Sequence, residues 1–178
     1  MPSEHTLKRF DEELERLNAT INEMGGLTES QFAKALTAVR ETAEETGLLL
    51  GVKGNEPPAT PGEIWTEFAN ANVYPDLGNI HFIARAITPP RRPRRFDTRF
   101  FTADASTIAH TIEGVVGPDS ELVELTWVPI AQAATLDMPT ITGIILEELA
   151  ARVEAGMAHD LPVPFYFMEN QVFMRELL

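Results

Sequence analysis

The stretch RETAEETGL, residues 40–48, places three carboxylates within five positions and ends in a glycine and a leucine. On an α-helix Glu41, Glu44 and Glu45 stand at i, i+3 and i+4, so their side chains share one face. Like charges at this spacing repel, and acids near a helix C-terminus also oppose the helix dipole. Arg40 precedes Glu44 by four residues, which is the weaker orientation for a helical ion pair. A solvated face is the alternative, but so little compensation favours a bound divalent cation, since Mg²⁺ takes carboxylate oxygens.

Helical periodicity predicts the helix that carries these acids. Thr28 is its expected N-cap, and Gly47 is a natural residue just beyond its C-terminus. A second amphipathic helix is expected over residues 3–24, ended by the glycine pair 25–26. The helix that carries the three acids has an apolar stripe that is expected to be buried and consists of Phe32, Leu36, Val39 and Ala43.

Short strands and helices follow along the rest of the chain. Strands are expected over residues 48–52, 80–87, 96–103, 121–128, 164–168 and 171–177. Helices are expected over residues 62–70 and 130–136, and a last long helix begins at Pro139. That helix is expected to bury Ile141, Ile144, Ile145, Leu149 and Val153. This mixture predicts a layered α/β domain.

The composition restricts the classes of partner. The 178 residues are 44% hydrophobic, which suffices for one domain with a core. A net charge of −13 argues against nucleic acids and anionic membranes, whereas a bound metal and local arginines still allow a phosphate substrate. The absence of cysteine fits a reducing cytoplasm. No run approaches the roughly 20 apolar residues of a membrane span, and the first nine residues lack a signal-peptide pattern.

The stretch RETAEETGL resembles the second half of the Nudix box, Arg-Glu-x-x-Glu-Glu-x-Gly-Leu. It differs only at Thr42, where that family usually has an aliphatic residue. The resemblance implies a Nudix-like α/β/α sandwich with a mixed sheet, a single domain over residues 1–178. Residues 28–47 would be the Nudix helix, and residues 1–26 an N-terminal helix or a helical insertion. The implied activity is metal-dependent hydrolysis of a pyrophosphate bond in a nucleoside diphosphate derivative.

The same resemblance implies roles for the residues of the motif. Glu44 and Glu45 would be ligands of Mg²⁺ or Mn²⁺. Glu41 would be a further ligand or the catalytic base that orients the attacking water. Arg40 would hold a neighbouring glutamate in place through an ion pair.

The first half of the box departs from the family pattern. Counting back from Arg40, Gly26 falls on the glycine position, but Phe32 stands where the family has a glutamate. The family also has several strands ahead of the motif, whereas one helix is expected here. Two explanations remain: a degenerate, weakened motif, or a chain that lacks the N-terminal strands and carries a long insertion inside the box. The alternative function is therefore a non-catalytic Nudix-like domain that binds a nucleotide or a partner.

We favour the insertion because two downstream segments resemble the large-insertion Nudix proteins. These segments are ARAITP at residues 84–89 and PRRFDTRFF at residues 93–101. The similar proteins include the peroxisomal coenzyme A diphosphatases and their bacterial relatives, which implies a coenzyme A-like substrate. Missing strands would leave a sheet edge unpaired. Two outcomes would follow: a second copy of the chain covers the edge and forms a homodimer, or the chain binds metal poorly and turns over slowly or not at all.

Five of the chain's 14 basic residues fall within nine positions, 91–99. Guanidinium groups bind phosphates, so Arg91, Arg92 and Arg94 are candidate substrate-binding residues, with plain solvation as the alternative. Arg95 and Arg99 are instead expected to pair with Asp97. Glu124, on a late predicted strand, is a candidate further ligand or base, and a solvated acid is the alternative.

Overall fold

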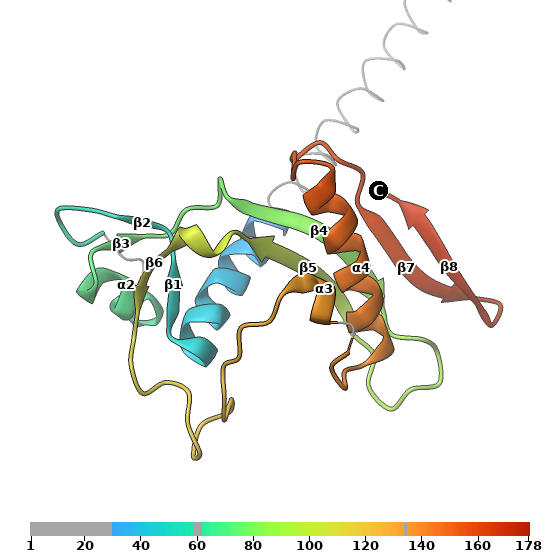
Figure 1. Ribbon diagram of the computed structural model, residues 1–178, viewed down its shortest axis with the longest axis horizontal. Coiled ribbons are helices and arrows are strands. Elements are labelled where there is room, and N and C mark those ends of the chain that lie inside the picture. The colour runs from blue at the N-terminus through green and yellow to red at the C-terminus, as the bar shows by residue number, and fades with distance from the viewer. Residues whose placement is uncertain (1–29, 59–61, 134) are drawn as a thin grey trace, which may run out of the picture. The chain divides into compact units, whose positions relative to one another are not determined.

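The computed structural model describes residues 30–58, 62–133 and 135–178. The chain divides into two compact units, residues 1–37 and 38–178. In the smaller unit only residues 30–37 are described, and they are helical. The helix expected over residues 3–24 and the glycine pair after it lie outside the described residues. The larger unit contains helices and three sheets, one of them a four-stranded mixed sheet, which confirms the α/β class (Figure 1).

The four-stranded sheet has the order β5-β4-β7-β8. Its strands are β4 (Ile80–Ile87), β5 (Asp97–Ala103), β7 (Pro164–Glu169) and β8 (Val172–Leu177). β4 is antiparallel to β5 and parallel to β7, and β7 forms an antiparallel hairpin with β8. Asn170 and Gln171 connect the hairpin with φ of 48° and 68°, the left-handed backbone that matches strand twist in a two-residue turn. All four strands agree with the sequence prediction within one residue at each end.

The main core lies between this sheet and helix α4 (Thr140–Glu154), which runs across it in Figure 1. Ile145 of α4 packs with Ala84 and Ala86 of β4 and with Tyr166 of β7. The sequence prediction is wrong for Val153, which is 48% exposed. The helix has turned this position away from the sheet, while Arg152 beside it is buried.

Arg152 fixes the loop that connects α4 to β7. Its Nη1 and Nη2 donate to the carbonyl oxygens of Ala158, Leu161 and Pro162, so backbone acceptors compensate most of a buried charge, while Nε has no partner within the described residues. In the same loop His159 stacks on His81 of β4, with ring centroids 4.2 Å apart. The loop is thereby held against the start of β4.

Two smaller sheets contain the remaining described strands of the larger unit. β1 (Leu48–Leu50) pairs with β6 (Ile108–Thr111), and β2 (Val52–Lys53) pairs with β3 (Val73–Tyr74). The strand predicted over residues 48–52 is therefore divided at Gly51. Four short helical segments lie between the strands: η1 (Glu63–Trp65), α2 (Thr66–Asn70), η2 (Ala105–Thr107) and α3 (Ile130–Ala133).

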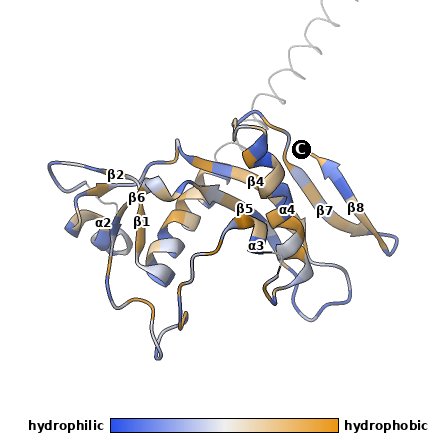
Figure 2. Ribbon diagram, in the orientation of Figure 1, coloured by the Kyte–Doolittle hydropathy of each residue, from blue (hydrophilic) through white to orange (hydrophobic). Residues whose placement is uncertain are grey.

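The strand predicted over residues 121–128 is wrong. This segment forms no strand and pairs with no other described strand. Its alternating apolar residues Val123, Leu125 and Trp127 are 68%, 41% and 66% exposed. In Figure 2 the hydrophobic colour of β1 contrasts with the mixed colours of the long connection from β6 to α3. Alternation alone does not make a strand when no partner edge is adjacent.

The predicted stripe of the helix at residues 30–46 is only partly correct. Val39 and Ala43 are buried at 1% and 6% exposure. Phe32 and Leu36 are wrong as core residues, because they are 57% and 38% exposed. Ala35, four residues before Val39, is buried instead, which rotates the buried face by one position.

Candidate functional site

The helix that carries the three glutamates ends in a fixed turn. The Gly47 amide donates to the Ala43 carbonyl at 2.9 Å, and the Gly47 carbonyl accepts from the Ile112 amide at 2.8 Å. Gly47 has a φ of +74°, and a Cβ at this position would lie 2.4 Å from the Ile112 carbonyl oxygen. Glycine is therefore required here both by backbone conformation and by close approach, as the sequence predicts for a helix C-terminus.

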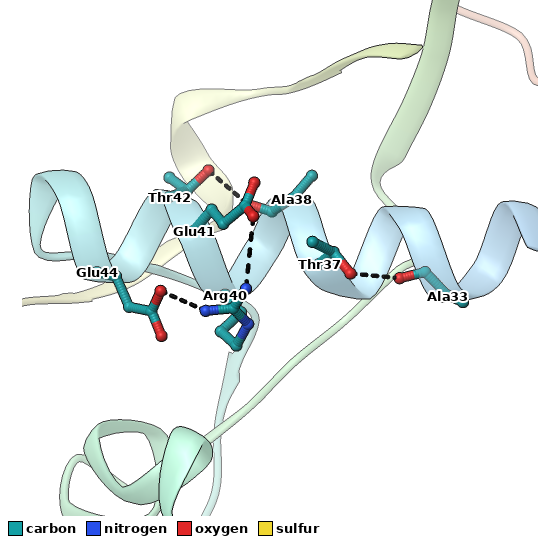
Figure 3. A network of polar contacts seen from close by, with 7 residues as sticks. All are labelled: Ala33, Thr37, Ala38, Arg40, Glu41, Thr42 and Glu44. Atoms are coloured by element: carbon teal, nitrogen blue, oxygen red, sulfur yellow. Dashed lines mark hydrogen bonds and ion pairs between the residues drawn. The ribbon is translucent and has the colours of Figure 1, made fainter. Parts of the chain in front are cut away.

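Arg40 lies between two of the three glutamates, as Figure 3 shows. One guanidinium nitrogen pairs with the Glu44 carboxylate, and the other lies 3.4 Å from Glu41 Oε1. The hydrogen bond that Arg40 donates to the Glu44 carboxylate raises the pKa of Arg40, so this cation remains charged. The ion pair that the sequence leads us to expect is present, but it engages Glu41 as well as Glu44. The Glu41 and Glu44 side chains remain 53% and 49% exposed.

The carboxylates match Mg²⁺ or Mn²⁺ in chemistry and exposure, because both ions prefer accessible carboxylate oxygens. The guanidinium of Arg40 stands in for such a cation, since it shows that one positive group can reach Glu41 and Glu44 together. Glu45 is exposed and forms no ion pair within the described residues. The present side-chain arrangement is nevertheless not that of a metal site: within the same residues, no three acids or histidines are grouped to hold an ion. Metal binding would require Arg40 to release a carboxylate.

The arginine-rich segment forms pairs that sequence analysis anticipates only in part. Arg99 Nη1 lies 3.8 Å from Asp97 Oδ1, as expected. Arg85 is the main partner, with two hydrogen bonds of 2.8 and 2.7 Å to Asp97. Arg95 donates instead to the Thr88 carbonyl at 3.0 Å. No signal along the sequence links residues 85 and 97, because their pairing follows from the β4–β5 register.

The remaining candidate residues do not assemble with the glutamates. Arg91, Arg92 and Arg94 are exposed, and within the described part of the chain they form no ion pair. Glu124 is also exposed and accepts a hydrogen bond of 3.1 Å from Thr126. It lies on the unpaired segment rather than on a strand.

Two cavities lie in the larger unit, and none of the three glutamates lines either of them. The first, about 300 Å³, is lined by Val39 and Thr42 on the buried side of the helix, by Leu48 and Leu50 of β1, and by Trp127. Trp127, which is 66% exposed, thus lies at the edge of this cavity. The second, about 340 Å³, is lined by residues of β4, β5, α4 and the loop arginine Arg92.

Comparison with known proteins adds no assignment: no family model, no curated protein and no solved structure matches this chain. Among the described helices, none combines the length and the hydropathy needed to cross a bilayer.

Proposed function

We propose that this protein is a metal-dependent hydrolase of the Nudix type that cleaves a pyrophosphate bond in a nucleoside diphosphate derivative. One observation carries the proposal. Glu41, Glu44 and Glu45 occupy the exposed face of a helix whose end is fixed by Gly47, and Arg40 already binds two of them. The resemblance of residues 40–48 to the Nudix box supplies the reaction class, and a coenzyme A-like substrate rests on that resemblance alone.

The residues of this face would have different roles in the reaction. Glu44 and Glu45 would hold Mg²⁺ or Mn²⁺, which when bound neutralises phosphate charge and lowers the pKa of a coordinated water. Glu41 would accept a proton from the attacking water or complete the ligand set. Arg40 would keep Glu44 directed toward the substrate, and its charge would favour an approaching diphosphate.

A second candidate is a Nudix-like domain that binds a nucleotide or a partner without hydrolysing it. Two observations favour it. The position of the expected first glutamate holds Phe32, which has no ligand atom, and Arg40 already pairs with two of the three acids. A domain of this kind would keep the helix and the turn at Gly47 but would not hydrolyse the bound compound.

A hydrolysis assay separates the two candidates. Coenzyme A and ADP-ribose would be incubated with the chain while Mg²⁺ and Mn²⁺ are titrated, and phosphorus NMR would follow the products. The hydrolase predicts metal-dependent products that disappear in Glu44→Gln and Glu45→Gln. The control is Glu67→Gln, which changes an exposed acid on α2. Saturable binding of intact compound, with no products at any metal concentration, supports the binding domain.

A further inference from the structure

The cavity of about 340 Å³ lies at the end of the main core, where β4 leaves the sheet and α4 begins. Its inner wall is apolar and comes from several elements: Ile87 of β4, Phe100 of β5, Ile144 of α4 and Phe173 of β8. This volume is at the small end of the range for ligand pockets, ~300–1,000 Å³. An apolar wall with few polar groups is the usual composition of such pockets.

Arg92 gives this cavity its charge. Among the described lining residues it is the only charged one. The neighbouring arginines Arg85, Arg95 and Arg99 have intramolecular acceptors, whereas Arg92 has none among the described residues. An uncompensated guanidinium beside an apolar wall attracts an anion, and the local sign is opposite to the chain's net charge of −13.

Neutral polar groups line the cavity beside Arg92. Thr98 and Thr140 line it, and their hydroxyls form no hydrogen bond within the described part of the chain. The Tyr166 hydroxyl is already engaged, because it donates to Glu148 and accepts from Arg175. No acid occupies the first turn of α4, which forms another part of the wall. The free donors and the one positive charge therefore suit an oxyanion.

We propose that this cavity binds a small amphipathic anion, with an apolar body against Ile144 and Phe173 and a carboxylate or phosphate group at Arg92. The site is separate from the carboxylate face, since neither Glu41, Glu44 nor Glu45 lines it. It needs no metal, so its test is independent of the proposed hydrolysis.

The test uses octanoate as the probe in calorimetric titrations of the full chain without metal. Octyl phosphate distinguishes a phosphate from a carboxylate preference, octanol removes the charge, and acetate removes the apolar body. We expect saturable binding of octanoate or octyl phosphate that is at least about tenfold tighter than that of octanol, because a hydrogen bond to a charged group is stronger than one between neutral groups. Acetate should bind too weakly to measure.

Two variants and a matched control locate the site. Arg92→Gln should weaken the binding of octanoate and octyl phosphate by about tenfold or more and leave the affinity for octanol unchanged. Thr98→Phe, at an exposed strand position suited to an aromatic residue, should fill the cavity and abolish binding of all three octyl compounds. Arg94→Gln, in the same loop but outside the cavity, should match the wild type. Equal affinity in Arg92→Gln and the wild type, or no saturable binding of either octyl anion, overturns the proposal.

Discussion

Replacing Gly47 by alanine tests whether the turn that ends the glutamate-bearing helix is as constrained as its geometry indicates. Alanine at a φ of +74° costs ~1–2 kcal/mol relative to a right-handed conformation. The reduced freedom of the unfolded chain offsets ~0.4–1 kcal/mol of that cost. The new Cβ would lie 2.4 Å from the Ile112 carbonyl oxygen and would have to move beyond 3.0 Å. That displacement strains the 2.8 Å bond from the Ile112 amide to Gly47, which is worth ~1 kcal/mol.

The expected loss in the free energy of unfolding is therefore about 1–3 kcal/mol, measured by urea denaturation. Gly114→Ala is the matched control. Gly114 has a φ of +79°, but nothing lies within 4 Å of its added Cβ, so only the conformational cost applies. Gly47→Ala should be the more destabilising variant by about 1 kcal/mol. If the two variants lose the same stability, close approach to Ile112 does not constrain this turn.

Three further predictions concern charge. Arg40→Gln should tighten Mn²⁺ binding by a small factor, because it frees two carboxylates, and should lower hydrolysis, because it no longer orients them. Unchanged Mn²⁺ affinity in a spin-resonance titration would show that Arg40 does not compete with the ion for these carboxylates. Burial lowers the pKa of His81 from its ordinary 6.5, so the unfolded chain binds more protons and stability should fall as the pH drops through that value. Urea denaturation at about pH 5.5 and 7.5 should show this slope in the wild type and a smaller one in His81→Gln. Glu148→Gln should cost about 1 kcal/mol through its ion pair with Arg175, whereas Glu147→Gln, at an exposed position, should not. Because Arg175 lowers the pKa of Glu148, the ion pair should contribute to stability at any pH above the ordinary pKa of a glutamate. The contribution should disappear as the pH falls through the lowered pKa of Glu148.

Local patterns predict the elements whose boundaries are marked by turn residues. β4 is bounded as expected, and Gly47 ends its helix as expected. β3 and β6 are missed, because strands of two and four residues carry too few alternating positions to stand out. The segment 121–128 shows the opposite error: its clear alternation predicts a strand, but no described strand pairs with it. Its exposed apolar residues keep the expected homodimer a testable prediction, which light scattering would check.

The candidate site shows the same division between local and long-range information. The shared face of the three glutamates follows from helical spacing. The ion pair of Arg40 is expected from the resemblance of residues 40–48 to the Nudix box, whereas helical spacing alone predicts weaker compensation than the pairing of Arg40 with both Glu41 and Glu44 provides. The bond between Arg85 and Asp97 depends on strand register, and the cavity at Arg92 depends on how α4 packs on the sheet. Such long-range relations leave no mark in the spacing of a single sequence.

The most direct measurement of the central claim is a Mn²⁺ titration of the wild type and three variants, followed by spin resonance of the free ion. If the exposed carboxylates bind a divalent cation, the wild type should show one saturable site. Glu44→Gln and Glu45→Gln should each weaken it by at least about tenfold, and Glu67→Gln should leave it intact. No saturable binding to the wild type, or equal binding to all four proteins, would mean that Arg40 alone compensates these acids and that the face holds no metal.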